Sequence, residues 1–522
     1  MIRPNFPDRT SPRRSARVLF LYPNEKDLST IPPAVALLST LLKEQGHEVR
    51  LFDTTFYQFD DEIAIENPDD KRFRSVERRP LDPSEMPKWE KHRIKYNRPA
   101  IGDFVAMVEE YQPDAITISC SETTFLRGLR FIQAVHGRGI PNLFGGVFPT
   151  FAPDLVMGNP EVTAACVGEG EHAIVEFVNR IANGQPFHDV TNLWARHRGK
   201  VFKNPSMEPV DINAIPTVTD VGLFDEARFY RPLGRKVRRL LPVETHRGCP
   251  YACSFCNSPS QNVKFGSGFF RKKDMALVKE EIEHHVREWD IDYVYFWADT
   301  FLAWSQREFD EFIEMYADIK LPFWCQTRIE TITHDKFAKL LDVGLDRVTF
   351  GLEHGNEKFR KEVVRREYTN ETAIEKMAIA NDLGVPYSVN NILGFPDETR
   401  ELAFDTIELN RQWRSDSMSV SILTPFHGTE TRRYAEEKGY IDHSVICSQS
   451  NADDSLLDMP SWSKEGISRL RETFALYVRF PKSRWPEIEK AETDPELLAT
   501  LREEYIQEFY SDSTALITDD IH

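Results

Sequence analysis

Short apolar runs alternate with segments that carry apolar residues on one helical face through the first third of the chain. Such alternation of strand and helix predicts a parallel sheet covered by helices. The helix that begins at Pro33 is expected to end near Gly46, a residue suited to a helix C-terminus. We expect strands at 18–22, 49–52, 115–119 and 142–144, and helices at 33–43 and 125–135.

Three stretches interrupt this pattern. Residues 1–16 are polar and basic, with Pro and Ser, which predicts a disordered lead. Residues 57–97 are rich in charge and Pro, which predicts a solvated insertion in the first domain, with a substrate lid as the alternative. Residues 186–240 are predicted to be a linker, so the first domain is expected to span 17–185.

A second series of strand and helix patterns occupies residues 241–439. Six strands with intervening helices predict a partial (β/α)6 barrel of the TIM type, open on one side. Ser305 and Glu308 form the signature of a capping box before one of its helices. Residues 440–522 are expected to be mainly helical. The six strands are expected at 241–244, 293–297, 323–327, 347–351, 387–393 and 417–423.

Composition narrows the class of protein. Acidic residues outnumber basic residues by 83 to 65, giving a formal net charge of −18, so no nucleic-acid partner is expected. No run of eighteen apolar residues occurs, so no membrane span is expected. Seven cysteines in 522 residues, without an apolar signal segment, indicate a reducing compartment, and we expect the protein in the cytoplasm.

Three of the cysteines lie close together, directly after the strand at 241–244. Cys249, Cys253 and Cys256 are separated by three and then two residues. Cysteine thiolates hold iron–sulfur clusters, and a run that offers only three leaves one iron of a four-iron cluster open to another ligand. The alternative is a closed zinc site with His246 as fourth ligand. That alternative is weaker, because zinc sites generally pair two short-spaced dyads and no second dyad is present.

The cysteine run resembles the cluster loop of the radical S-adenosylmethionine (SAM) superfamily. The likeness includes Phe255 before the last cysteine and Arg247 and Gly248 before the first. It implies a [4Fe–4S] cluster held by the three cysteines, with SAM chelated to the open iron and cleaved reductively to a 5′-deoxyadenosyl radical. It also implies a radical SAM barrel over 241–439 and an electron donor such as flavodoxin or ferredoxin.

Polar residues follow several of the expected barrel strands, where α/β barrels place their working side chains. Asp299 and Arg328 stand after the second and third strands, and Asn390 lies within the fifth. SAM needs a partner for each of its polar groups, because a buried unpaired polar group costs about 1–3 kcal/mol. Arg328 suits a carboxylate, and Asn390 suits a ribose. For Asp299 the alternative is a helix-start cap.

Glu353 follows the fourth strand. The run from Gly351 through Glu353 to Gly355 resembles the family's Gly-x-Glu-x-Gly motif, which implies a contribution to the SAM amine and the cluster environment. Phe255 is expected to lie beside the adenine. The alternative for Glu353 is a simple ion pair with Arg328 across the strand ends.

Small and hydroxyl residues fill the strand-to-helix turns of the first domain. Open parallel sheets bind ligands beyond the carboxyl ends of their strands. Ser119, Ser121 and Thr123 follow one strand, and Gly145 and Gly146 follow the next. These residues let a large planar ligand approach the backbone, although a Gly pair alone equally makes a turn.

The run 145–150, continued by 168–171, is similar to the cobalamin-binding domain that precedes many radical SAM domains. The resemblance implies a flavodoxin-like (Rossmann-type) α/β fold over 17–185 and cobalamin as a cofactor. Two departures stand out, because 24–29 holds no His and Phe148 stands where many members have His. Cobalamin is therefore expected to bind without a histidine from these loops on the cobalt. The alternative is a domain that has lost the cofactor.

His354 and Tyr387 are the remaining polar residues that can exchange a proton or a hydrogen atom with a substrate. We predict catalytic roles for both, with satisfied core residues as the alternative. The run 424–429 resembles the turn that closes the barrel in relatives.

These features together predict a cobalamin-dependent radical SAM enzyme that functionalises an unactivated carbon, most often by methylation. A second hypothesis is a radical rearrangement, cyclisation or oxidation without methyl transfer. A third is a non-catalytic scaffold stabilised by a metal. A methylthiotransferase is disfavoured, because neither its additional cysteine set nor a basic RNA-binding tail is present. The substrate is expected to be a small molecule, a lipid or a peptide.

Overall fold

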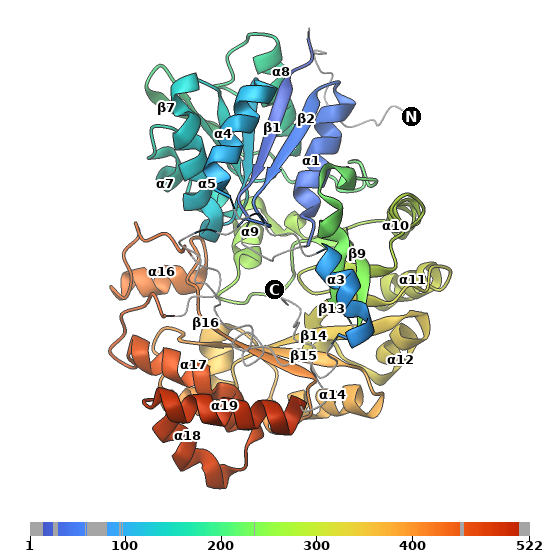
Figure 1. Cartoon of the computed structure of the whole chain (residues 1–522), viewed down its shortest axis with the longest axis vertical. Coiled ribbons are helices and arrows are strands. Elements are labelled where there is room, and N and C mark those ends of the chain that lie inside the picture. The colour runs from blue at the N-terminus through green and yellow to red at the C-terminus, as the bar shows by residue number, and fades with distance from the viewer. Residues whose placement is uncertain are drawn as a thin grey trace.

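The structure is a computed structural model, and it describes residues 14–24, 30–57, 59, 81–92, 96, 98–233, 235–448 and 454–510. Most of the expected lead (1–16), most of the expected insertion (57–97) and the run 25–29 lie outside the described residues. Two seven-stranded sheets form the body of the protein, the first above the second in Figure 1. In the part of the chain that the structure describes, no helix is long and apolar enough to cross a membrane.

The first sheet has the strand order β2-β1-β3-β4-β5-β6-β7. The strands β1 to β5 run parallel, in the order that flavodoxin-like folds have, so the expected fold of the first domain is confirmed. β6 and β7 add an antiparallel hairpin beside β5. The strands are β1 (Arg17–Tyr22), β2 (Glu48–Asp53), β3 (Ala115–Ser119), β4 (Asn142–Gly145), β5 (Ala164–Cys166), β6 (Leu193–His197) and β7 (Lys200–Lys203). The helices are α1 (Pro33–Glu44), α4 (Ala100–Tyr111), α5 (Glu122–Val135), α6 (Val147–Phe151), α7 (Pro153–Met157) and α8 (Glu171–Ala182).

The second sheet has the strand order β16-β15-β14-β13-β12-β9-β8. The six strands β9 and β12 to β16 run parallel and alternate with helices, which confirms the partial (β/α)6 barrel. Among the described strands, β16 and β8 are its two edges, so the barrel is open between them. The strands are β8 (Tyr230–Leu233), β9 (Lys236–Glu244), β12 (Tyr293–Trp297), β13 (Phe323–Arg328), β14 (Leu345–Glu353), β15 (Tyr387–Leu393) and β16 (Ser417–Ile422). The helices are α10 (Met275–Trp289), α11 (Gln306–Tyr316), α12 (His334–Val343), α14 (Asn370–Asp382) and α15 (Arg400–Asn410).

Local sequence signals fix several helix ends. Gly46, with a φ of +83°, follows the last turn of α1, as the sequence predicts. Ser305 caps α11, and the Glu308 side chain accepts from the Ser305 amide at 2.7 Å, so the capping box is confirmed. These ends are set by residues adjacent in sequence, which is why they are predictable.

The segment 186–240 is more than a connector. It supplies β6 and β7 to the first sheet and β8 to the second. β8 pairs antiparallel with the start of β9. The sequence offered no signal for these strands, because each is only four or five residues long and interrupts its apolar positions with charged residues.

The described part of the expected insertion packs on the outside of the barrel. Helix α3 (Met86–His92) lies against β8, where the His92 ring stacks on the Tyr230 ring with 3.6 Å between centroids. Lys88 Nζ donates to the Val237 carbonyl oxygen at 2.8 Å. The described residues of this segment therefore cover an edge strand.

The C-terminal region is helical, as expected from the sequence. Its helices are α16 (Glu430–Glu437), α17 (Lys464–Arg479), α18 (Trp485–Ala491) and α19 (Pro495–Tyr510), and they pack beside β15 and β16 in Figure 1. A buried cluster that includes Ile422, Ile467 and Leu470 joins β16 to α17. These helices cover one edge of the open barrel.

One apolar core runs through both sheets. It includes Val18 and Phe20 of β1 together with Val243 of β9 and Phe296 of β12. All four side chains are almost fully buried. The two sheets are therefore packed together, with the carboxyl ends of both facing the space between them (Figure 1).

Candidate functional site

The three cysteines lie on the loop after β9 and the short strand β10 (His246–Arg247). Gly248 has a φ of +86°, and a Cβ there would lie 2.9 Å from the Phe269 ring, so the turn into the loop needs glycine. Cys256 is the N-cap of α9 (Asn257–Phe265), and its Sγ accepts from the Ser258 amide at 3.5 Å. The loop presents its thiols at the carboxyl end of the barrel sheet.

The spacing of the sulfur atoms separates the two metal hypotheses. A tetrahedral zinc with Zn–S bonds of about 2.3 Å holds its sulfurs about 3.8 Å apart. Among the described residues, the one group of three such ligand atoms that all lie within 4.8 Å of one another is His427, Glu436 and His443, so the cysteines form no such group. The wider donor set fits three thiolates on a multi-iron cluster.

His246 is engaged elsewhere. Its Nε2 lies 3.0 Å from the Thr300 carbonyl oxygen, and its Nδ1 lies 3.1 Å from the Thr245 hydroxyl. Burial lowers the pKa of His246 to about 4. Both ring nitrogens have hydrogen-bond partners, which argues against His246 as a fourth metal ligand.

Burial raises the pKa of the Cys249 thiol and raises that of Cys256 to about 12. Metals bind the thiolate, so cluster assembly must release these protons. A guanidinium stands beside the second cysteine of the loop, because Arg328, which also pairs with Glu330, has its Nη1 3.1 Å from Cys253 Sγ. The same guanidinium lies 3.9 Å above the Tyr251 ring.

A cavity of 630 Å³ separates the carboxyl ends of the two sheets. This volume falls within the usual range of cofactor sites, about 300–1,000 Å³. Its wall combines the end of β3 and the loops after β4 and β5 with the cluster loop and the end of β12. Among the expected site residues, the wall includes Ser119, Gly145, Gly146, Phe255, Cys256 and Asp299.

The other two hydroxyl residues of the first domain serve its own helix. Ser121 and Thr123 hydrogen bond to each other at 2.8 Å at the start of α5, and neither lines the cavity. Gly146 also has a local role, because its φ is +121° and a Cβ would overlap the Cys120 carbonyl oxygen. Gly145 has room for a Cβ, since the nearest atoms would lie 3.9 Å away.

Asp299 brings a carboxyl group to the cavity wall. It accepts a hydrogen bond from the Ser258 hydroxyl of α9, two residues after Cys256. Burial raises the pKa of Asp299, against the Ser258 hydrogen bond and with the help of the nearby Glu244 charge. The N-cap of the next helix is Ser305, so Asp299 is not the cap that was the alternative.

Glu353 pairs with an arginine that the sequence did not single out. Its Oε1 lies 3.0 Å from a terminal nitrogen of Arg366, which also donates to the Gly351 carbonyl oxygen. Burial raises the pKa of Glu353, and Arg366 opposes that rise. Glu353 has a φ of +66°, and a Cβ on Gly351 would overlap its carboxylate. The alternative pairing of Glu353 with Arg328 is not formed.

Arg366 also acts on the cluster loop. Its guanidinium lies 5.8 Å from the Phe255 ring centroid, and the charges of Cys253 and Glu353 contribute to a pKa well above the usual arginine range, against burial. Arg365 beside it is exposed and pairs with Glu430. The sequence around Arg365 and Arg366 does not distinguish the two arginines. Only the fold buries Arg366 and leaves Arg365 exposed.

Asn390 lies in the barrel interior rather than at the cavity wall. Its Oδ1 accepts from the Ser419 hydroxyl at 2.8 Å across β15 and β16. Asn391 faces the opposite way, and its side chain accepts from Asn410 at 2.8 Å. The strand alternation therefore gives the interior position to Asn390.

His354 and Tyr387 have the contacts of core residues. His354 Nδ1 accepts from the Asn356 amide at 3.1 Å and Nε2 lies 3.1 Å from Glu398, with both side chains fully buried. Tyr387 stands at the amino end of β15, and its hydroxyl lies 3.0 Å from Asn381 Oδ1. Neither residue lines the cavity, so these contacts favour the alternative over a catalytic role.

A buried ion network ties the cluster loop to the first domain. Arg247 Nη1 lies 2.8 Å from Glu169 and 2.7 Å from Glu171, both at the start of α8. Its Nε lies 3.1 Å from Glu244 at the end of β9. Arg271 adds a second contact to Glu169, at 2.6 Å. The run 168–171 therefore contacts the residue two positions before Cys249.

An acid and a lysine stand in the cavity wall next to this network. Lys273 Nζ lies 3.3 Å from Glu281 Oε2, and both side chains are buried. Burial raises the pKa of Glu281 to about 7, with Lys273 opposing and Glu244 adding to the rise. The cavity thus has a carboxyl group that titrates near neutral pH.

The structure shows whether any histidine of the first domain reaches the cavity. Phe148 is buried against Phe125 and the His427 ring, and it does not line the cavity. Among the described residues that line the cavity, the one histidine is His246, which belongs to β10. The first domain therefore brings no imidazole to this space in the described part of the chain.

Known proteins share both halves of the chain. The profile of the Radical SAM superfamily matches residues 243–409, and that of the B12 binding domain matches residues 88–178. An uncharacterized methyltransferase of Pyrococcus horikoshii is 26% identical over 394 residues, which cover 73% of this chain and 82% of the relative. The anaerobic magnesium-protoporphyrin IX monomethyl ester cyclase of Rubrivivax gelatinosus is 28% identical over 330 residues, 60% of this chain and 57% of the cyclase.

A solved structure has the same architecture. The radical SAM methyltransferase TsrM from Kitasatospora setae, with cobalamin and a [4Fe–4S] cluster bound, superposes with a TM-score of 0.60 at 16% identity. The match covers 96% of this chain and 100% of that one.

The fold, the three-cysteine loop and these matches define an enzyme that uses an iron–sulfur cluster and SAM. Residues 243–409 therefore form a radical SAM domain, and a B12 binding domain precedes it over residues 88–178. The cofactors of this protein are a [4Fe–4S] cluster, SAM and cobalamin.

Proposed function

We propose that this protein is a cobalamin-dependent radical SAM methyltransferase that acts on an unactivated carbon. The cavity between the two sheets carries the proposal, because its wall combines loops of the first domain with the cluster loop. A cofactor held by the first domain and one held by the cluster loop therefore face the same space. Reaction partners held at short range in one site react without the entropic cost of meeting in solution.

When bound, the cluster and SAM supply a radical that removes a hydrogen atom from the substrate, and cobalamin supplies the methyl group. Cys249, Cys253 and Cys256 hold the cluster in this proposal. Arg366 orients the Glu353 carboxylate, which is the group available to a SAM amine. Asp299 and Asn390 are the remaining polar groups of the barrel end that we assign to SAM.

Cobalamin lies against the small residues of the first-domain wall in our proposal. Ser119 and Gly145 leave the backbone accessible there. Because the described cavity wall holds no histidine of the first domain, these loops would hold cobalamin through their backbone and small side chains, and the bound cofactor would supply the methyl group.

A radical cyclisation without methyl transfer is the second candidate. Its support is the match to the cyclase of Rubrivivax gelatinosus, which covers a smaller share of this chain than the methyltransferase match, so methyl transfer is the favoured reaction. The zinc-stabilised scaffold has less support, because the cysteine sulfurs do not approach one another as a mononuclear site requires.

We assign the substrate to the small-molecule, lipid or peptide class and the reductant to a low-potential carrier such as flavodoxin or ferredoxin. The cytoplasm is the proposed location, because free cysteines that must stay reduced for a cluster suit that compartment.

Anaerobic purification and reconstitution with iron and sulfide test the proposal. We expect bound cobalamin, four-iron clusters and dithionite-dependent cleavage of SAM to 5′-deoxyadenosine. Cys253→Ala should abolish the cluster and the cleavage. Cys325→Ala is the matched control, because Cys325 is buried in β13 away from the cluster loop and should leave both intact.

The outcomes separate the candidates. Cleavage without cobalamin would remove the methyltransferase proposal and leave a radical enzyme. Zinc in place of iron, with no cleavage, would favour the scaffold. Cobalamin with cleavage but no transfer of label from methyl-labelled SAM to a product would favour cyclisation.

A further inference from the structure

The turn that closes the barrel lies where the two cofactor-binding halves meet. We call residues 424–431 the closing turn; it follows β16 and leads into α16. At its centre His427 and Gly428 are packed between the first domain and α9. His427 is 3% exposed and Glu122, the first residue of α5, is 4% exposed, so their contact excludes water.

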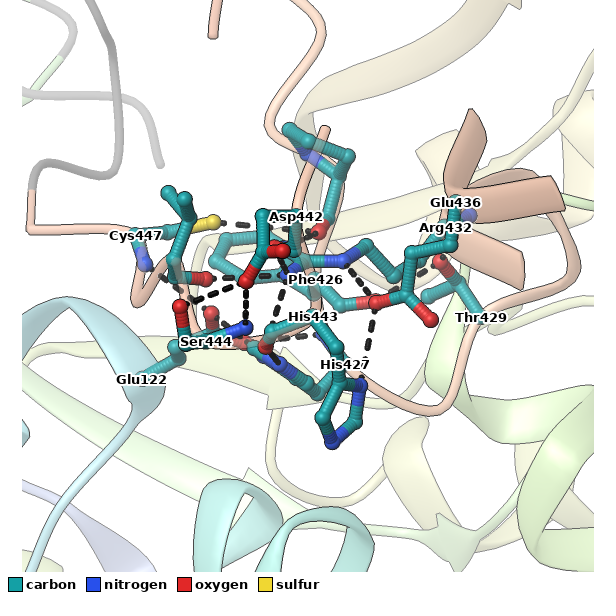
Figure 2. Close-up of polar contacts among 12 residues, drawn as sticks. Glu122, Phe426, His427, Thr429, Arg432, Glu436, Asp442, His443, Ser444 and Cys447 are labelled. Atoms are coloured by element: carbon teal, nitrogen blue, oxygen red, sulfur yellow. Dashed lines mark hydrogen bonds and ion pairs between the residues drawn. The ribbon is translucent and has the colours of Figure 1, made fainter. Parts of the chain in front are cut away.

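Glu122 is held by two hydrogen bonds from His427 of this turn and by a third from Cys447. Its Oε1 lies 2.8 Å from His427 Nδ1, and its Oε2 accepts from the His427 amide at 2.8 Å. Oε1 also accepts from the Cys447 amide at 2.9 Å. Figure 2 shows the carboxylate of Glu122 reaching up to His427 and Cys447.

The hydrogen-bond partners of His427 determine which of its ring nitrogens carry a proton. Nδ1 faces a carboxylate, and Nε2 lies 2.8 Å from the His443 carbonyl oxygen. A carbonyl oxygen can only accept, so Nε2 must donate, and an ionised carboxylate requires Nδ1 to donate too. Both Glu122 oxygens also accept from backbone amides, those of His427 and Cys447, and with the hydrogen bond to His427 these contacts lower the pKa of Glu122 despite burial and favour the carboxylate. Glu122 and His427 are therefore a buried ion pair.

A second buried histidine provides the contrast. His47 Nδ1 accepts from the Ala16 amide at 3.2 Å, while Nε2 lies 2.8 Å from Asn179 Oδ1. One nitrogen accepts and the other donates, so His47 is neutral, and burial lowers its pKa. His47 and Asn179 both belong to the first domain.

The closing turn contacts the loops of both cofactor sites. On the first-domain side, Glu122 follows Ser121, and the Phe148 ring lies 5.5 Å from the His427 ring, two residues after Gly146. A Cβ on Gly428 would overlap the Phe151 ring, so the contact with α6 depends on glycine.

On the cluster side, the hydrogen bonds start next to the cysteines. Asn257, which follows Cys256, donates to the His427 carbonyl oxygen at 2.9 Å. The Thr431 amide donates to the Ser254 carbonyl oxygen at 3.0 Å, between Cys253 and Cys256. One short turn therefore contacts the cluster loop and the ends of two first-domain strands.

We propose that the Glu122–His427 ion pair is a positioning contact that fixes the first-domain loops after β3 and β4 relative to the cluster loop, and so sets the distance between the two cofactors. The inference rests on the proposed function for the identity of those cofactors. The contact itself is independent of them. Arg432 of α16 donates to Glu436 beside His427 and to the His443 carbonyl oxygen, so a guanidinium is the cation that this cluster already contains.

Hydrogen exchange of the full chain without cofactors tests the contact. Glu122→Gln keeps the side-chain shape, His427→Asn keeps an amide near the position of Nδ1, and each removes one charge. Each should raise the exchange rate of the closing turn and of the first turn of α5 by about tenfold or more, and the double variant should exchange no faster than either single variant. His47→Asn is the matched control, and it should leave the closing turn unchanged.

Histidine-labelled NMR spectra should show both ring nitrogens of His427 protonated in the wild type, assigned by the signal lost in His427→Asn. Unchanged exchange in both single variants, additive effects in the double variant, or a neutral His427 would overturn the proposal.

The cofactor distance is measured by electron paramagnetic resonance on the reconstituted enzyme. The magnetic interaction of bound cobalamin in its cobalt(II) state with the reduced cluster depends steeply on their separation. The spread of this interaction among the molecules of the sample should be wider in Glu122→Gln than in His47→Asn. The same interaction in both variants would overturn the positioning role. Wild-type enzyme without cobalamin would count against the proposed function, while the exchange data would still decide the contact.

Discussion

Arg328 Nη1 lies 3.1 Å from Cys253 Sγ, so a cation at the end of β13 is held against one of the three cluster cysteines. Charge and hydrogen bonds at the sulfurs set the reduction potential of an iron–sulfur cluster, and a nearby cation favours the reduced form. The cluster of this enzyme should therefore depend on Arg328 for its potential.

Arg328→Gln should lower the reduction potential of the cluster while iron content stays unchanged. Potentiometric titration followed by electron paramagnetic resonance measures it. Arg365→Gln removes an exposed cation near the same loop and should leave the potential unaltered. An equal shift in the two variants would mean that the effect comes from overall charge.

Arg366→Gln should weaken SAM binding by about 10- to 100-fold, because a buried charge-assisted hydrogen bond contributes about 1.5–3 kcal/mol. Without Arg366, the Glu353 carboxylate loses its partner at 3.0 Å and is buried alone. Equilibrium binding of SAM to the reconstituted enzyme is the measurement. Arg365→Gln is again the control. A normal SAM affinity in Arg366→Gln would show that Arg366 does not orient the Glu353 carboxylate for SAM.

Gly146→Ala should prevent stable folding of the first domain, or lower the unfolding temperature strongly, while Gly145→Ala should fold. The φ of +121° at Gly146 belongs to a region that only glycine occupies without strain of about 1–3 kcal/mol, and a Cβ would also meet the Cys120 carbonyl oxygen. An added Cβ on Gly145 would have its nearest atoms 3.9 Å away. Circular dichroism melting of the two variants compares them, and equal stabilities would contradict the steric explanation.

Glu281 should make the stability of the protein fall as pH rises from about 4.5 to about 7. Its pKa is about 7 in the folded protein, against an ordinary value of 4.5. As pH rises, the unfolded chain therefore loses this proton at a lower pH than the folded protein does. The contribution to the free energy of unfolding decreases between about pH 4.5 and 7, by about 3 kcal/mol at most. Lys273 and Glu244 are the charged groups beside it.

Denaturant unfolding of the wild type and of Glu281→Gln at several pH values measures this slope. The difference in stability between the two proteins should shift in favour of Glu281→Gln as pH rises from 5 to 8. A constant difference over that range would show that Glu281 does not retain its proton on folding.

Tyr387→Phe should leave SAM cleavage within about twofold of wild type and cost about 1 kcal/mol of stability, the usual net value of a hydrogen bond. The hydroxyl is committed to Asn381 at the amino end of β15, away from the cavity. Rates of 5′-deoxyadenosine formation and thermal melting separate the two effects. Loss of cleavage with normal stability would restore Tyr387 as a catalytic residue.

Sequence patterns alone predicted four strands and two helices of the first domain, the six parallel strands of the barrel, the cluster loop and the candidate residues at strand ends. Periodicity and capping are local, so the positions of α1 and α11 follow from residues close to one another in the chain. The cysteine spacing is equally local, because three thiols within eight residues must share one neighbourhood whatever the rest of the fold does.

Tertiary structure decided which polar residues meet. Arg366 and Arg365 are alike in sequence, and only packing buries one against Glu353 and exposes the other to solvent. Strand direction sends Asn390 into the barrel and places Tyr387 at the wrong end for the cavity. Glu122 and His427 are 305 positions apart, and only the packing of the first domain on the closing turn forms their ion pair. Such contacts depend on burial and distance in space, and the order of residues along the chain does not encode them locally.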